Sequence, residues 1–129
     1  MLKRLDNIGI AVRDLASAHD FYTRVLGFAG APLKDGATGF SAKLGDVALF
    51  VFATDQTNSP GRTADYEHNP AGIDHLAFEV EDYEGAQREL EAKGVRFLQD
   101  SVGEPGGFRY RGFQDPDGNM LYVIHPGAS

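Results

Sequence analysis

An internal repeat constrains this chain more than any other feature. Residues 5–15 align without gaps with residues 73–83, and residues 49–52 align with residues 121–124. The spacing of the two matches differs only by a short insertion, which a loop tolerates at little cost. A repeat on this scale predicts two copies of one small structural unit. Identical residues anchor the first match: Asp6 with Asp74, Val12 with Val80, and Asp14 with Asp82.

Both halves predict the same order of elements. Residues 5–12 alternate in the manner of a strand, and Asp14 follows at a position typical of a helix N-cap. Apolar residues at helical spacing continue to Gly27, which is expected to end the helix. Three short strands are then expected near 28–33, 38–44 and 47–53.

The second half repeats this order, with Asp82 as the N-cap and Gly94 as the helix end. Its three later strands are expected near 95–100, 108–114 and 119–125. Residues 54–72 are polar and rich in Pro, Gly, Asn and Thr, which predicts a linker. The expected organisation is a single domain, residues 1–129, with βαβββ modules at 1–53 and 73–129.

Each predicted sheet is covered by its helix on one face only, so its other face must meet a partner or line a cavity. We expect an α+β fold in which the two tandem βαβββ modules pair into a cup- or barrel-like mixed sheet with the helices outside. Small residues on the inward face would leave volume for a ligand. Strand alternation assigns these inward positions: Asn7, Gly9, Ala11, Ala48, Phe50, Phe52, His75, Ala77, Glu79, Tyr110, Gly112, Gln114, Met120, Tyr122 and Ile124.

Composition excludes several classes of partner. The formal net charge of −7 argues against nucleic acid and anionic membranes, which both require a basic surface. No apolar run approaches the roughly 20 residues that span a bilayer, and the N-terminus enters a strand pattern without room for a signal peptide. Cysteine is absent, so neither disulfides nor thiol chemistry are available. Together these features predict a cytoplasmic protein.

Three further runs of sequence resemble the vicinal oxygen chelate superfamily: Phe21–Phe28, Gly72–Phe78 and Phe113–Asn119. That superfamily includes glyoxalase I, extradiol dioxygenases, and the fosfomycin and bleomycin resistance proteins. The resemblance covers nearly the whole chain, and it is more specific for the fold than for the function, because the superfamily hosts many activities. It implies a small-molecule ligand and a homodimer, with the modules paired within one chain or swapped between two.

The resemblance also implies where a metal would bind, on the first and last strands of the modules. Those positions hold Asn7, Phe50, His75 and Tyr122, and only His75 is a good ligand. A catalytic divalent metal needs about three protein ligands. We therefore expect no metal and no other cofactor, with a divalent metal as the disfavoured alternative.

His75 and Tyr122 are the candidates for acid–base chemistry. In the alternative interpretation, His75 is a structural residue that forms a hydrogen bond with a neighbour such as Tyr122, and the Tyr122 ring fills space. Arg109 and Arg111 share a strand face and predict either an anion site or surface ion pairs. The other candidate ligand contacts are Asn7, Phe50, Phe52, Glu79 and Tyr110.

Three hypotheses for the function follow. The first is a metal-free small-molecule-binding protein of the glyoxalase/bleomycin-resistance type. The second is a glyoxalase-like lyase, an isomerase or a dioxygenase-related enzyme, which would use a divalent metal or an acid–base site of His75 and Tyr122. The third is a module whose pocket is filled by its own aromatic side chains, a role to which Phe50 and Tyr122 are suited.

Overall fold

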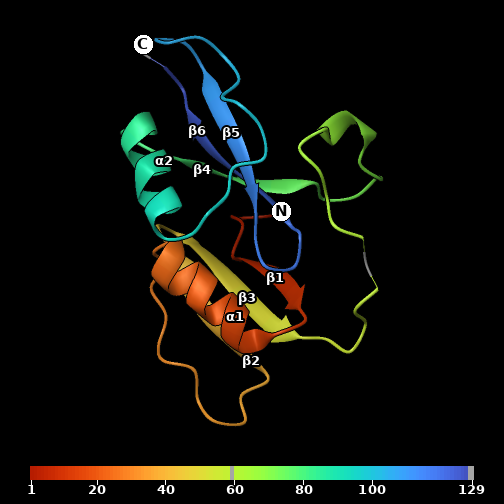
Figure 1. Cartoon of the computed structure of the whole chain (residues 1–129). Helices are drawn as coiled ribbons and strands as arrows, with labels where there is room; N and C mark the ends of the chain where they lie inside the picture. Colours follow the sequence, from red (N-terminus) through yellow and green to blue (C-terminus); the bar gives the residue numbers. More distant parts are fainter. Residues whose placement is uncertain (59, 128–129) are drawn as a thin grey trace. The chain divides into compact units, whose positions relative to one another are not determined.

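The computed structural model describes residues 1–58 and 60–127 of the chain. The chain forms two compact units, which we call unit 1 (Met1–Ser59) and unit 2 (Pro60–Ser129). In Figure 1, unit 1 runs from red to yellow-green and unit 2 continues to blue. Each unit has a three-stranded mixed sheet with a helix packed on it, which confirms the predicted α+β class.

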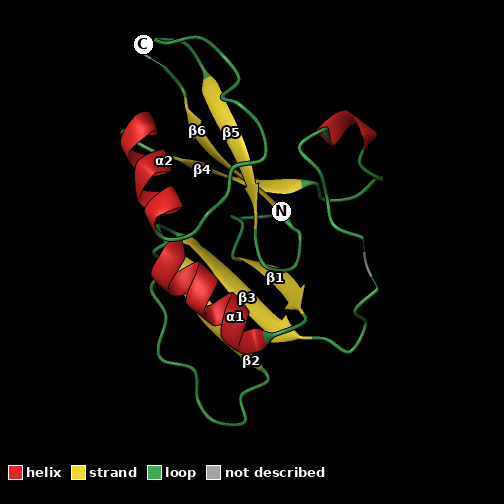
Figure 2. Ribbon diagram, viewed as in Figure 1, coloured by secondary structure: helices red, strands yellow, loops and turns green. Residues whose placement is uncertain are grey.

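Unit 1 has its helix on one face of the sheet, as Figure 2 shows. Its strands are β1 (Asn7–Val12), β2 (Gly39–Leu44) and β3 (Val47–Ala53), in the spatial order β1-β3-β2. β1 is parallel to β3, because the helix lies in the connection after β1, whereas β2 is antiparallel to β3. A turn connects β2 to β3, with Gly45 at φ +60°.

The helix of unit 1 begins and ends at the predicted residues. The Asp14 carboxylate accepts a hydrogen bond from the Ser17 backbone N–H (3.1 Å), which confirms the N-cap. Helix α1 (Leu15–Asp20) then continues as the π-helix η1 (Phe21–Val25). Gly27 follows at φ +83°, where a glycine carries no Cβ penalty. The spacing of apolar residues in the sequence did not predict the wider turn of the π-helix.

Unit 2 has the same sheet topology as unit 1. Its strands are β4 (His75–Glu79), β5 (Arg109–Gln114) and β6 (Met120–His125), in the order β4-β6-β5. Helix α2 (Tyr83–Ala92) packs on β6, and the Asp82 carboxylate caps it by accepting from the Gly85 N–H at 3.0 Å. A short 3-10 helix, η2 (Tyr66–His68), lies in the segment that precedes β4.

The core of each unit lies between its helix and its sheet. On β3, burial alternates with the period of two expected for a strand, and Leu49 and Val51 are almost fully buried. Leu121 and Val123 are buried at the equivalent positions of β6, where Met120 and Tyr122 of the other parity are buried as well. The opposite face of each sheet therefore carries the residues of the other parity, which include most of the predicted site residues.

The predicted fourth strand of each sheet is wrong. Residues 28–33 and 95–100 were expected to be strands, but the chain near them forms only single bridges, between Ala29 and Lys43 and between Val102 and Tyr110. In unit 2 the reason is visible, because the Gln99 side chain accepts the Gly112 N–H (3.0 Å) that a strand would have bonded. Each module is therefore βαββ in its regular elements.

The turn that connects β5 to β6 is built around a buried carboxylate. Asp115 is 5% exposed and accepts the backbone N–H groups of Asp117 (2.9 Å) and Asn119 (2.8 Å). The Asn119 side chain donates a further bond to it at 2.8 Å, and Gly118 takes φ +81°. The run Asp115–Asn119 is thus a structural turn. Among the described residues, no helix has the length and apolar character to cross a membrane.

Candidate functional site

A cavity of about 230 Å³ opens within unit 2. Three strands contribute to it from the sheet face that α2 does not cover. His75 and Ala77 come from β4, Tyr110 from β5, and Tyr122 and Ile124 from β6. The remaining two lining residues are Tyr66, at the start of η2, and Phe108, in the loop before β5. The strand residues all have the parity that places them on one face.

The wall of this cavity is a continuous run of aromatic rings. His75 meets Tyr122 edge to face, with ring centroids 4.7 Å apart and an interplanar angle of 75°. Tyr122 meets Tyr110 in the same manner at 5.6 Å, and Tyr110 contacts Phe108 at 6.1 Å. Such edge-to-face pairs fix the orientation of each ring beyond what burial alone achieves. The cavity is therefore preformed, and it presents ring faces and edges to a ligand.

The Tyr122 hydroxyl is a buried polar group without a hydrogen-bond partner among the described residues. The Tyr122 side chain is only 3% exposed. Burial is the main cause that raises the pKa of this phenol above its usual 10.0, and the nearby Asp74 carboxylate adds to it. The phenol is therefore protonated at neutral pH and remains a hydrogen-bond donor with nothing to bond, an arrangement that costs about 1–3 kcal/mol.

His75 is tied to its sequence neighbour Asp74. Its Nδ1 lies 2.7 Å from Oδ2 of Asp74. This hydrogen bond is the largest cause that lowers the pKa of Asp74 below 3.8, followed by the bond from Asn69. An ionised carboxylate can only accept, so Nδ1 of His75 carries the hydrogen. In the structural alternative, His75 bonds a neighbour such as Tyr122; the neighbour that it bonds is Asp74, whereas the Tyr122 ring only touches the His75 ring.

Asp74 is itself held by residues 62–69, a segment that we call the clasp. Asn69 donates its Nδ2 hydrogen to Oδ1 of Asp74 at 2.7 Å, and the Arg62 guanidinium lies 3.9 Å from the same oxygen. The clasp is anchored on the sheet, because the Arg62 N–H bonds the Gly118 carbonyl (2.9 Å) and Gln114 bonds the Arg62 carbonyl (2.6 Å). The clasp also carries Tyr66 to the cavity.

The structure brings together three of the predicted site residues, His75, Tyr110 and Tyr122. Glu79, predicted as a ligand contact, is exposed at the end of β4 and does not line the cavity. β4 extends two residues beyond Ala77, its last residue in the cavity wall, so Glu79 lies outside the cavity.

The remaining predicted contacts lie in unit 1. Phe50 is 47% exposed on β3, and its ring stacks on that of Phe52 at 5.6 Å. Asn7 is exposed at the start of β1 and donates a hydrogen bond to Asp6 at 2.9 Å. These three side chains share the helix-free face of unit 1, as alternation predicted.

Sequence reasoning missed two residues of the cavity wall, Tyr66 and Phe108. Tyr66 lies in the polar segment that was predicted to be a linker, and it is the single aromatic residue between positions 54 and 72. An isolated aromatic residue in such a segment was the available signal. Phe108 precedes β5 by one residue, and it has the parity of Tyr110.

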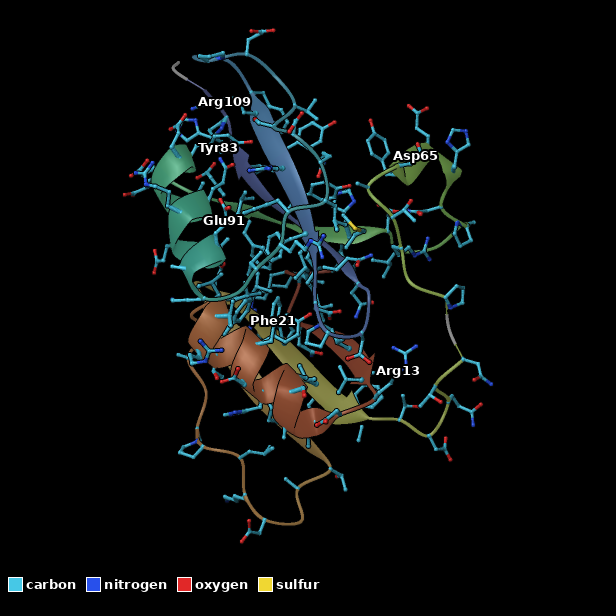
Figure 3. The ribbon with its side chains drawn as sticks, in the orientation of Figure 1. Arg13, Phe21, Asp65, Tyr83, Glu91 and Arg109 are labelled. Atoms are coloured by element: carbon cyan, nitrogen blue, oxygen red, sulfur yellow. The ribbon has the colours of Figure 1, made fainter. Side chains whose placement is uncertain are left out.

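Arg109 and Arg111 do not form an anion site, because other residues of unit 2 bind them. Figure 3 shows Arg109 close to Tyr83, over whose ring its guanidinium lies 4.4 Å from the centroid. Arg109 also pairs with Glu84. Arg111 donates to the Gln99 carbonyl (2.7 Å) and lies over the Phe97 ring at 4.7 Å.

The residues at the implied metal positions do not fit a divalent metal. Within residues 1–58 and 60–127, no three His, Cys, Asp or Glu side chains gather closely enough to hold an ion. Of the four implied residues, Phe50 has no donor atom and Tyr122 keeps its proton, since burial raises its pKa. His75 is left as one good ligand where about three are needed.

Comparison with known proteins gives consistent matches. The family model of the Glyoxalase/Bleomycin resistance protein/Dioxygenase superfamily matches residues 4–123. An ethylmalonyl-CoA/methylmalonyl-CoA epimerase of Cereibacter sphaeroides is 36% identical over 110 residues, covering 81% of this chain and 80% of the relative.

Solved structures extend the comparison to the fold. The glyoxalase family protein from Enterococcus faecalis has a TM-score of 0.74 at 27% identity, covering 95% of this chain and 97% of the other. TnmS3, an antibiotic binding protein from Streptomyces sp. CB03234, has a TM-score of 0.71 at 22% identity, covering 98% of both chains. At that identity, the likeness to TnmS3 shows the fold alone.

Proposed function

The chain belongs to the Glyoxalase/Bleomycin resistance protein/Dioxygenase superfamily, and from this premise we propose that it binds a small organic molecule in the cavity of unit 2, without a metal ion. The observation that carries the proposal is the preformed aromatic cavity with an unpartnered phenol in its wall. An apolar cavity of about 150 Å³ holds benzene. The cavity of about 230 Å³ in unit 2 therefore accommodates a single-ring molecule with a substituent.

Two further observations support binding. The unpartnered Tyr122 hydroxyl is a cost that a ligand acceptor would relieve. TnmS3, which has the same fold, is an antibiotic binding protein. The donor set at the implied metal positions favours a metal-free site, since only His75 is a good ligand there.

A thermal-shift screen of metabolites and antibiotics tests this proposal. A compound present at 100 times its dissociation constant stabilises the folded state by about 2.7 kcal/mol. In an Ala77→Leu variant the added side chain occupies the cavity, so the stabilisation should be lost. Ala11→Leu, an exposed alanine on β1 of unit 1, is the matched control and should leave it unchanged. A screen without any stabiliser, or a ligand that binds Ala77→Leu as well as wild type, would contradict the proposal.

The second candidate function is an isomerase that moves a proton with His75 and Tyr122. The Asp74–His75 hydrogen bond favours it, because a carboxylate that orients a histidine is a common feature of general bases. The relative from Cereibacter sphaeroides, described as an epimerase, also favours it. Incubation of the screen's best ligand in deuterated water separates the two candidates. Exchange of a carbon-bound hydrogen that His75→Gln abolishes indicates an enzyme, whereas an unchanged ligand indicates binding alone.

A further inference from the structure

The wall of the cavity in unit 2 has one hydrogen-bond acceptor and one hydrogen-bond donor. The acceptor is on His75. Because Nδ1 donates to the Asp74 carboxylate, the neutral ring has its lone pair on Nε2. Asp74 does not line the cavity, so Nε2 is the ring nitrogen that remains for a bound molecule.

The clasp prevents this arrangement from reversing. Asn69 accepts two hydrogen bonds at its Oδ1, from the Thr63 N–H (3.0 Å) and the Thr63 hydroxyl (3.1 Å). Its amide is therefore oriented with Nδ2 towards Asp74, to which it donates at 2.7 Å. Position 74 must consequently present an acceptor to Asn69, and its other oxygen is left for His75.

The donor is the hydroxyl of Tyr122. It is buried, protonated and without a partner in the described part of the chain. Its ring lies edge to face with that of His75, at a centroid distance of 4.7 Å. Tyr122 and His75 are therefore neighbours in the cavity wall.

The remaining wall excludes charge. The lining consists of aromatic side chains together with Ala77 and Ile124, and none of the described Lys, Arg, Asp or Glu side chains contributes to it. Burying a charged group there without a compensating ion pair is unfavourable. Flat, uncharged ligands that cover ring faces are favoured instead.

We propose that the cavity selects an uncharged aromatic molecule whose substituent carries a hydrogen-bond acceptor next to a hydrogen-bond donor, as a primary amide or an α-hydroxyketone does. The acceptor receives the Tyr122 hydroxyl, and the donor bonds Nε2 of His75. Asp74 acts as the positioning residue that keeps Nε2 an acceptor. The inference rests on the proposed function, because it names the class of molecule that the cavity takes.

Three probes of nearly one shape test the proposal: benzamide, acetophenone and benzoate. Acetophenone replaces the NH₂ donor of benzamide by a methyl group, and benzoate replaces it by a charged acceptor. Dissociation constants are measured by NMR titration of the labelled full-length chain. We expect benzamide to bind about tenfold more tightly than acetophenone, since a lost hydrogen bond that leaves a buried group unpaired has about this effect. Benzoate should bind most weakly.

Asp74→Asn provides the decisive variant. With Asn69 still donating, the new amide must turn its oxygen to Asn69 and its NH₂ to His75, so Nδ1 becomes the acceptor and Nε2 the donor. The preference for benzamide over acetophenone should then fall to about one or reverse, a change of selectivity that loss of stability would not produce. Asp20→Asn is the matched control, because Asp20 bonds Arg24 (2.8 Å) in an exposed pair of unit 1. It should leave the preference unchanged.

Tyr122→Phe should weaken benzamide and acetophenone alike, because both give an acceptor to that hydroxyl. Equal affinities of wild type for benzamide and acetophenone, or a preference that survives Asp74→Asn, would overturn the inference while binding itself stands. The inference is also overturned, while binding itself stands, if a compound from the thermal-shift screen occupies the cavity but benzamide does not. If neither the probes nor any screened compound binds there, both the inference and the proposed function fail.

Discussion

Nδ1 of His75, the first residue of β4, lies 2.7 Å from Oδ2 of Asp74, the residue that precedes it in the sequence. Because the carboxylate only accepts, the neutral imidazole must carry its hydrogen on Nδ1. We predict that nitrogen-15 shifts of His75 in mildly alkaline buffer show the Nδ1–H tautomer in wild type and the Nε2–H tautomer in Asp74→Asn. An Nε2–H tautomer in the wild-type protein would contradict the assignment.

The hydrogen bond from Asn69 predicts how Asp74 titrates. The bonds from His75 and Asn69 hold the pKa of Asp74 below its usual 3.8. A carboxyl group whose pKa is lowered by folding stabilises the folded state above its unfolded pKa, and this contribution is lost as the pH falls through the lower folded value. Asn69→Ala should raise the pKa of Asp74 and shift that loss to higher pH, as followed by carbon-13 NMR of the carboxyl group. An unchanged pKa would show that the clasp does not act on Asp74.

Two equally buried tyrosines should respond in opposite ways to loss of the hydroxyl. Tyr83 and Tyr122 are each 3% exposed. The Tyr83 hydroxyl pairs with Ser101 Oγ at 2.7 Å, whereas that of Tyr122 is unpartnered in the described chain. We expect Tyr83→Phe to lower the free energy of unfolding by about 1 kcal/mol, and Tyr122→Phe to leave it unchanged or raise it by up to about 1 kcal/mol. Urea denaturation measures both, and a large loss in Tyr122→Phe would reveal a partner for that hydroxyl.

The Asp115 turn should be a large local contributor to stability. Asp115→Ala removes three hydrogen bonds to a buried carboxylate and should lower the free energy of unfolding by about 3 kcal/mol. Asp46, an exposed residue of the β2–β3 turn, is the control, and Asp46→Ala should change it by less than about 0.5 kcal/mol. Equal effects would mean that the buried bonds at Asp115 contribute little.

Strand alternation and helix caps made much of the fold predictable. Local sequence patterns predicted the order of the elements and the helix caps at Asp14 and Asp82. Each of these features depends on residues that are close together in the sequence. The same alternation placed His75, Tyr110 and Tyr122 on one face of one sheet. The site could be predicted to that extent, since side-chain direction in a strand has a period of two.

What could not be predicted depends on contacts between segments distant in sequence. Tyr66 reaches the cavity because the Arg62 N–H bonds the Gly118 carbonyl. No local sequence pattern predicts this bond. The predicted strand near 95–100 is absent because the Gln99 side chain, and not the backbone of a neighbouring strand, accepts the Gly112 N–H. Likewise, the partner of His75 depends on rotamers, which the clasp sets through Asn69 and Asp74.

Amide resonances mapped during titration with the best ligand of the screen would show whether a ligand occupies the cavity of unit 2. We predict that the largest shift changes fall on residues of the cavity wall, among them Ala77, Tyr110 and Tyr122. Changes confined instead to the exposed face of unit 1, at Asn7, Phe50 and Phe52, would contradict it.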